Sequence, residues 1–180
     1  MKFDQIIVID VESTCWQGKV PPGEINEIIE IGVCPIDTKS GNLLNSRGIL
    51  VRPEHSTISE YCTQLTTLTQ EDIDTGITFR EACSILVNDY KTKDRVWASY
   101  GYYDMDQFEI QCERDNVQYP FSNSHINVKI LFAVVNSLPK RVGMTEALKI
   151  LKIPLEGIHH RGIDDAQNIA NILSKILFKR

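Results

Sequence analysis

The sequence lacks any long apolar segment, and this absence argues against a protein that crosses a bilayer with helices. No uninterrupted apolar run in its 180 residues approaches the roughly 18 that a membrane-spanning helix needs. Asp4 and Asp10 flank the first short apolar stretch, a pattern unlike that of a signal peptide. We therefore expect a soluble, cytoplasmic protein without a membrane partner.

Cysteines are few and carry no metal-binding or disulfide pattern. The five are odd in number and widely spaced, and no C-x-x-C pair occurs among Cys15, Cys34, Cys62, Cys83 and Cys112. This argues against a zinc ribbon and against a disulfide framework. Cysteines of this kind are usually small buried residues of proteins in a reducing compartment.

Positive charge is also scarce. The chain has 19 Lys and Arg against 24 Asp and Glu, for a net charge of −5, which taken alone disfavours nucleic-acid binding. Two bound divalent cations would, however, leave a net charge of only −1. Residues 126–161 are locally basic, with six cations against two acids. We hypothesise that part of this segment steers a phosphate backbone; the alternative is an ordinary solvated face.

Hydrophobic periodicity predicts an α/β layer sandwich in a single domain. The expected strands are 4–10, 27–37, 47–53 and 95–101, the first three as a meander. The expected helices are 78–93, 103–116, 144–153 and about 162–178. Residues 125–138 fit a strand, a helix or one after the other, and residues 54–78 are polar and irregular with short helical turns.

Two carboxylates follow the apolar run of the first expected strand, in the stretch I-I-V-I-D-V-E. Asp10 and Glu12 are two residues apart, so on a strand both side chains point to one face. Burying two bare carboxylates is costly unless they are paired or bind a cation. The alternative is that the strand has already ended and both acids are solvated.

Another acid opens the helix predicted after the fourth strand. Asp104 shares a helical face with Phe108 and Cys112 and should therefore point toward the sheet. Its alternative role is that of an N-terminal acid that favours the helix dipole.

The last helix begins with a further candidate pair. Asp165 lies at the edge of the apolar face of that helix, and His160 lies five residues earlier in a loop. A lone loop histidine is more often a surface residue. His159 is a second candidate, but His160 alone has the five-residue offset to Asp165.

Taken together, four inward-pointing acids and one histidine come from separated elements. Oxygen ligands suit Mg²⁺ or Mn²⁺ rather than zinc. Two such ions about 4 Å apart can stabilise both the attacking and the leaving oxygen of a phosphoryl displacement. A nearby imidazole could deprotonate the attacking water.

These motifs make the sequence resemble the DEDDh 3′–5′ exonucleases of the DnaQ-like superfamily, which have the ribonuclease H-like fold. Asp10 and Glu12 match the D-x-E motif, and Asp104 matches the second motif in ASYGYYDMDQFEIQC. His160 and Asp165 match H-x-x-x-x-D in HRGIDD. The resemblance implies an α/β fold with a central mixed five-stranded sheet flanked by helices, in one exonuclease domain over residues 1–180.

A closer resemblance is to the branch that holds the histone-mRNA 3′ exonucleases and the bacterial KapD-like proteins. The stretch CTQLTTL is similar to that branch's C-x-x-L-T-G-I core, with Thr67 in place of the glycine, and ESTC is similar to its E-A-T-C. Tyrosines replace the tryptophan that this branch often carries before the second-motif Asp. The D-x-E motif begins at residue 10, so we expect a bare catalytic domain, as in the bacterial members.

The resemblance implies roles for the matched residues. Two divalent ions, Mg²⁺ or Mn²⁺, would be held by Asp10, Glu12, Asp104 and Asp165. His160 would be the general base. The partner would be the 3′ end of a single-stranded nucleic acid, with RNA favoured, and the product a nucleoside 5′-monophosphate.

It also implies residues that contact the substrate. The backbone and side chains near Ser13, Thr14 and Cys15 would contact the terminal nucleotide, and Leu65 and Thr66 would pack around its base. Trp16 could stack on a base or simply pack.

Three alternative functions stay open at this point: a DNA-directed 3′–5′ exonuclease, a ribonuclease H-type endonuclease, and a non-catalytic regulatory module that keeps the fold. The spacing of His160 and Asp165 favours the exonuclease over the endonuclease. The retention of all five motif residues favours an enzyme over the regulatory module. The oligomeric state is not predicted.

Overall fold

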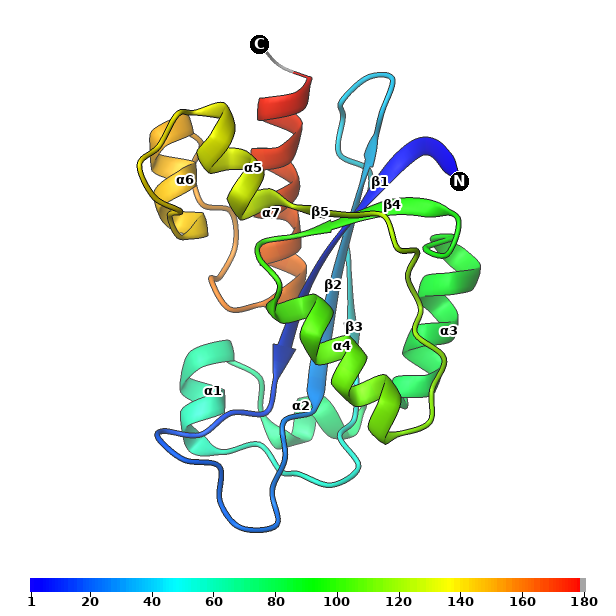
Figure 1. The fold of residues 1–180 in the computed structure, drawn as a ribbon. Coiled ribbons are helices and arrows are strands. Elements are labelled where there is room, and N and C mark those ends of the chain that lie inside the picture. The colour runs from blue at the N-terminus through cyan, green and yellow to red at the C-terminus, as the bar shows by residue number, and fades with distance from the viewer. Residues whose placement is uncertain (179–180) are drawn as a thin grey trace.

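A five-stranded mixed sheet in the order β3-β2-β1-β4-β5 runs through the centre of the computed structural model, which describes residues 1–178 (Figure 1). Its strands are β1 (Lys2–Ser13), β2 (Ile28–Asp37), β3 (Arg47–Leu50), β4 (Arg95–Ser99) and β5 (His125–Asn127). The first three form an antiparallel meander, and β4 and β5 run parallel to β1. The predicted fold class is confirmed.

Helices cover both faces of this sheet (Figure 1). They are α1 (Glu60–Thr66), α2 (Gln70–Asp74), α3 (Phe79–Asp89), α4 (Tyr103–Arg114), α5 (Val128–Val135), α6 (Met144–Leu151) and α7 (Gly162–Leu177). Residues 125–138 thus contain a strand followed by a helix. Among residues 1–178 no helix has the length and apolar character needed to cross a membrane.

Alternation along β1 divides the core into two layers. Ile7, Ile9 and Val11 pack on one face with side chains of α3 and α4, whereas Ile6 and Val8 pack on the other face with α5, α6 and α7. Period-two alternation extends the second series to residues 10 and 12. The two carboxylates of the D-x-E motif therefore point to the face that α7 covers.

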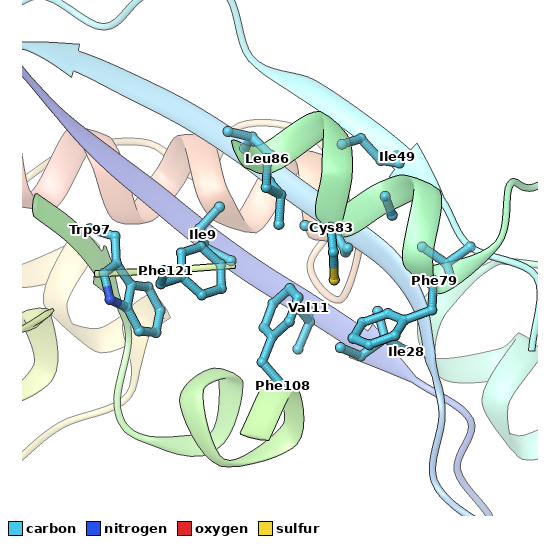
Figure 2. Packing of buried hydrophobic residues seen from close by; sticks show 14 of the residues in the cluster. Ile9, Val11, Ile28, Ile49, Phe79, Cys83, Leu86, Trp97, Phe108 and Phe121 are labelled. Carbon is cyan, nitrogen blue, oxygen red and sulfur yellow. The ribbon is translucent and has the colours of Figure 1, made fainter. Parts of the chain in front are cut away.

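The layer on the α3 and α4 side is built around aromatic rings (Figure 2). Phe79 of α3 and Phe108 of α4 have ring centroids 5.9 Å apart, and Trp97 of β4 stacks on Phe121 at 4.2 Å. Rings of this size dominate core energetics because each buries a large apolar area. This packing fixes α4, which carries Asp104, against β1.

The polar stretch 54–78 is more ordered than its sequence suggests. Ser59 caps α1 by accepting the Cys62 N–H, and Thr69 forms a reciprocal capping box with Asp72 at the start of α2. Side chains that cap helix ends are polar by necessity, so they weaken any apolar pattern. Thr67 ends α1 in the left-handed conformation, with φ 65°.

Candidate active site

The two carboxylates of the D-x-E motif lie within β1, not beyond its end. Asp10 pairs with Gly32 and Glu12 pairs with Glu30 across the antiparallel ladder with β2. The alternative of a strand that has already ended is therefore excluded. Glu12 is 9% exposed, and Asp10 Oδ2 is buried with no hydrogen-bond partner among residues 1–178.

Burial and the crowding of these acids raise their pKa values. Burial, followed by the nearby charge of Asp104 and then of Glu12, raises the pKa of Asp10 well above its usual value. Burial and the charge of Asp165 raise the pKa of Glu12 to about 8. Acids held this close repel one another, so the site favours either protons or a bound cation.

Asp104 reaches the same site from α4. It is 4% exposed, and its Oδ1 accepts a hydrogen bond of 3.0 Å from the Val11 N–H in the middle of the motif. Burial raises the pKa of Asp104 to about 6, and the Val11 N–H partly offsets this rise. The expected orientation toward the sheet is confirmed.

Asp165 is brought to β1 by a close backbone contact between α7 and β2. A Cβ added to Gly32 would lie 1.7 Å from the carbonyl oxygen of Gly162, so only glycine fits at position 32. Because Gly32 is the ladder partner of Asp10, this contact sets the first turn of α7 directly over the D-x-E motif. Asp165 is 4% exposed there.

Both histidines of the preceding loop contact this cluster, in different ways. His159 Nδ1 lies 2.8 Å from Asp165 Oδ2, and the same oxygen accepts the His160 backbone N–H at 3.0 Å. His160 Nδ1 faces Glu12 Oε1 at 3.9 Å, and the two imidazoles stack at 3.9 Å. The five-residue offset therefore identifies a backbone contact of His160, and it misses the side-chain contact that His159 makes with Asp165.

The acid cluster fits a divalent cation. One oxygen each of Asp10, Glu12 and Asp165 lie within 4.8 Å of one another, and Oδ2 of Asp10 has no hydrogen-bond partner among residues 1–178. Carboxylate oxygens are the preferred ligands of Mg²⁺ and Mn²⁺. Asp104 lies outside that group of three, although it lines the same pocket.

This pocket has a volume of about 380 Å³ and opens at the carboxyl ends of the parallel strands. Its wall includes all five motif residues and the predicted contact residues Ser13, Cys15 and Leu65. Ser13 Oγ is buried without a hydrogen-bond partner among residues 1–178. A polar atom of this kind at a pocket wall is suited to a ligand.

Three of the predicted contact residues do not line the pocket. Thr14 is fully buried, and its hydroxyl bonds the Ile25 carbonyl and the Glu27 N–H. Thr66 is also fully buried, with its hydroxyl donating to the Cys62 carbonyl. Trp16 is half-buried in the loop after β1 and does not line the pocket either. Both threonine side chains stabilise the fold, and the geometry gives no support to their predicted contacts with a nucleotide.

Several residues of the wall were missed by sequence reasoning. They are Tyr100, Tyr103, Gly143 and Met144, whereas Lys129 belongs to the basic segment 126–161 but was not predicted to line the pocket. Tyr103 directly precedes Asp104, so its position next to a motif residue could have identified it as a residue of the site. Tyr100 and Lys129 follow β4 and β5, and only the parallel order of β1, β4 and β5 brings them to the acids.

Comparisons with known proteins agree with this geometry. Residues 7–173 match the family model described as Exonuclease (RNase T). The 3′-5′ exoribonuclease 1 of Homo sapiens is 32% identical over 186 residues, which cover 97% of this chain and 53% of that protein. The chain therefore spans about half the length of such curated relatives.

Solved structures show the same fold. The nuclease domain of 3′hExo, described as a DEDDh family member bound to rAMP, is 30% identical with a TM-score of 0.88, over 97% of this chain and 92% of that one. A 3′-exonuclease described in recognition of the 3′ end of a histone mRNA stem-loop is 29% identical with a TM-score of 0.88, over 98% and 83% of the respective chains.

Proposed function

Because the chain belongs to the exonuclease family, we propose that it is a metal-dependent 3′–5′ exonuclease that converts single-stranded RNA or short oligonucleotides to nucleoside 5′-monophosphates. The observation that carries this proposal is the group of Asp10, Glu12 and Asp165 oxygens within 4.8 Å, with one buried oxygen left without a partner. The preference for RNA is supported by the relative named an exoribonuclease and by the similar domain bound to rAMP.

Four acids would hold the metal, as two ions of Mg²⁺ or Mn²⁺: Asp10, Glu12, Asp104 and Asp165. When bound, such ions stabilise the charge that develops on phosphate oxygens during displacement. The contact between the Val11 N–H and Asp104 Oδ1 leaves the other oxygen of Asp104 for this task. Cation binding would also relieve the repulsion that raises the pKa values of Asp10 and Glu12.

His160 would act as the general base. Burial and the neighbouring His159 lower the pKa of His160, so its imidazole is mostly neutral at pH 7 and can accept a proton from water. The water oxygen then forms a bond to phosphorus, the bond from phosphorus to the upstream O3′ breaks, and O3′ takes a proton from solvent while His160 returns its own proton to solvent. The products are a strand with a free 3′ hydroxyl and a nucleoside 5′-monophosphate.

The terminal nucleotide would lie at the wall formed by Ser13, Cys15 and Leu65. Ser13 Oγ offers the hydrogen-bonding group without a partner, and Tyr103 adds an aromatic ring beside the acids. Base stacking on such a ring is tolerant of sequence, as a non-specific exonuclease requires.

The basic segment 126–161 would steer the rest of the substrate. Lys140 and Arg141 are exposed in the loop between α5 and α6, close to the pocket wall at Gly143. Replacing both by Glu should raise the KM for a long substrate but not for a dinucleotide ester. Equal effects on both substrates would contradict the steering role.

A location in the reducing cytoplasm, with residues 1–180 as one exonuclease domain, completes the proposal. Its support is that all five cysteines are free and four of them are buried.

The test is a time course on a 5′-labelled single-stranded RNA and its DNA twin with Mn²⁺, beside the Asp10→Ala variant. A ladder that shortens from the 3′ end, absent in the variant, is the expected result. Faster loss of the RNA would support the ribonucleotide preference, and faster loss of the DNA would overturn it. No cleavage of either strand by a protein that binds Mn²⁺ would contradict the exonuclease itself.

A further inference from the structure

Lys129 is a cation in the wall of a pocket that is otherwise rich in carboxylates. It is half-buried in the first turn of α5 and forms no ion pair with any acid among residues 1–178. Four acids and two histidines line the same pocket, yet the ammonium group is directed to the ring of Tyr100, 6.0 Å from its centroid. An ammonium held in a pocket without a counter-ion is suited to an anionic ligand.

The fold holds this lysine in place from two sides. Asn127 caps α5 by accepting the Ile130 N–H at 3.0 Å, which fixes the turn that carries Lys129. The Tyr100 hydroxyl donates a hydrogen bond of 3.1 Å to the Val142 carbonyl, which ties the end of β4 to the loop before α6. Lys129 therefore projects from a rigid corner made by β4, β5 and the start of α6.

The position of this corner relative to the acids suggests which anion it meets. β1, β4 and β5 are parallel, so Lys129 lies at the same edge as the acids but two strands away from β1, about 10 Å across the sheet. In Figure 1, α5 and α6 lie on one side of the start of α7, and α1, the helix that contains Leu65, lies on the other. The acids thus separate the Leu65 wall from the Lys129 wall.

We propose that Lys129 binds the phosphate one nucleotide upstream of the phosphodiester that is cleaved, an inference that rests on the proposed exonuclease function. With the terminal nucleotide at the Leu65 wall and the scissile phosphate at the acids, the strand leaves the pocket past Lys129. The scissile phosphate faces the metal-binding acids, whereas the next phosphate meets an ammonium that no acid neutralises. The ligand class is a nucleic-acid strand with at least two phosphates.

Two dinucleotides test this subsite directly. NpN contains only the scissile phosphate, and pNpN adds a 5′ phosphate at the upstream position. We expect the wild type to have about tenfold higher kcat/KM for pNpN than for NpN, the gain typical of one charge-assisted contact. In Lys129→Met that ratio should fall close to one, and in Lys129→Arg it should remain near the wild-type value.

The matched control is Lys175→Met, which removes an exposed lysine from the far end of α7 and should keep the wild-type ratio. If Lys129→Met lowers both kcat/KM values by the same factor, or leaves the ratio unchanged, the subsite is wrong while the exonuclease stands. If the wild type cleaves neither dinucleotide nor longer strands, the proposed function fails and the subsite fails with it.

Discussion

Arg161 donates hydrogen bonds to the buried carboxylate of Glu30 from two nitrogens of its guanidinium group. Nε and Nη2 lie 3.1 and 3.3 Å from the two carboxylate oxygens, and Glu30 is only 1% exposed. Glu30 also accepts the Gly162 N–H at 2.8 Å. A single acid on β2 thus holds both residues that follow His160, and it ties the histidine loop to the sheet.

Replacing Arg161 by Met should therefore destabilise the protein and displace the histidine loop. We expect a loss of about 2–4 kcal/mol in the free energy of unfolding, because Glu30 would remain buried without its charge partner. Urea denaturation measures the loss, and kcat should fall more than KM rises.

The control is Arg95→Met. Arg95 makes a similar fork to Asp4, with contacts of 2.9 and 2.7 Å, but the Asp4 side chain is 50% exposed. Removal of Arg95 leaves the Asp4 carboxylate in solvent, so no buried charge loses its partner and the loss of stability should be smaller than in Arg161→Met. Some loss is expected, because the Arg95 side chain is only 13% exposed and also donates to the Tyr90 carbonyl at 2.8 Å. Equal losses in the two variants would contradict the importance of burial at Glu30.

Gly32→Ala should be among the most damaging small substitutions in the chain. The added methyl group would meet the backbone carbonyl of Gly162 at 1.7 Å, and backbone cannot move aside as a flexible side chain can. We expect α7 to shift from β2, with a loss of about 3 kcal/mol or more in the free energy of unfolding. Divalent cation binding should be lost as well.

Gly143→Ser is the control, since nothing lies within 4 Å of a Cβ there and Ser suits an N-cap. A fully stable Gly32→Ala protein would show that this backbone contact is not essential.

Much of this arrangement could be predicted from the sequence because the relevant signals are local. Alternation in β1 indicates the face of Asp10 and Glu12, and the helical stripe around Phe108 indicates the face of Asp104. The residues of the pocket wall that the sequence did not predict depend on the geometry between distant elements. The parallel order of β1, β4 and β5 brings Lys129 to the acids, and no local pattern encodes strand order.

The predicted nucleotide contacts of Thr14 and Thr66, which the geometry does not support, have a different origin. Both lie in motifs that resemble a nucleotide-binding family, and resemblance does not distinguish a residue that touches the ligand from one that supports its neighbours. Thr14 bridges the Ile25 carbonyl and the Glu27 N–H, so it fixes the turn after the acids from inside the fold.

Stability of the metal-free protein should fall as the pH rises from about 4.5 to 8. Glu12 has an ordinary pKa of 4.5 and a folded-state pKa of about 8, so over this window the folded state binds the additional proton. Stability decreases with pH wherever the folded state binds more protons than the unfolded state. Asp104, with its pKa raised to about 6, acts in the same direction over the lower part of that window.

Thermal unfolding at pH 5 and pH 8 in the presence of a chelator measures this effect. Adding Mg²⁺ or Mn²⁺ should raise the Tm more at pH 8 than at pH 5, because a cation competes with the protons of these acids. Glu12→Gln should flatten the pH dependence without metal. A chelated wild type that becomes more stable toward pH 8 would contradict the crowding of acids at this site.

The two loop histidines can be separated by their partners. His159 Nδ1 is held by Asp165 at 2.8 Å, so its imidazole is oriented toward a carboxylate proposed to hold metal. His160 makes only a longer approach of 3.9 Å to Glu12, and its imidazole is therefore freer to take a proton from water.

We expect His160→Gln to lower kcat by about 10²–10⁴ with little change in KM, as for loss of a general base. His159→Gln should lower kcat by about tenfold or less and weaken the apparent affinity for Mn²⁺, since Asp165 would lose a side-chain partner. Steady-state kinetics across a Mn²⁺ titration distinguishes the two variants. A larger loss of kcat in His159→Gln than in His160→Gln, at saturating Mn²⁺, would transfer the role of general base to His159.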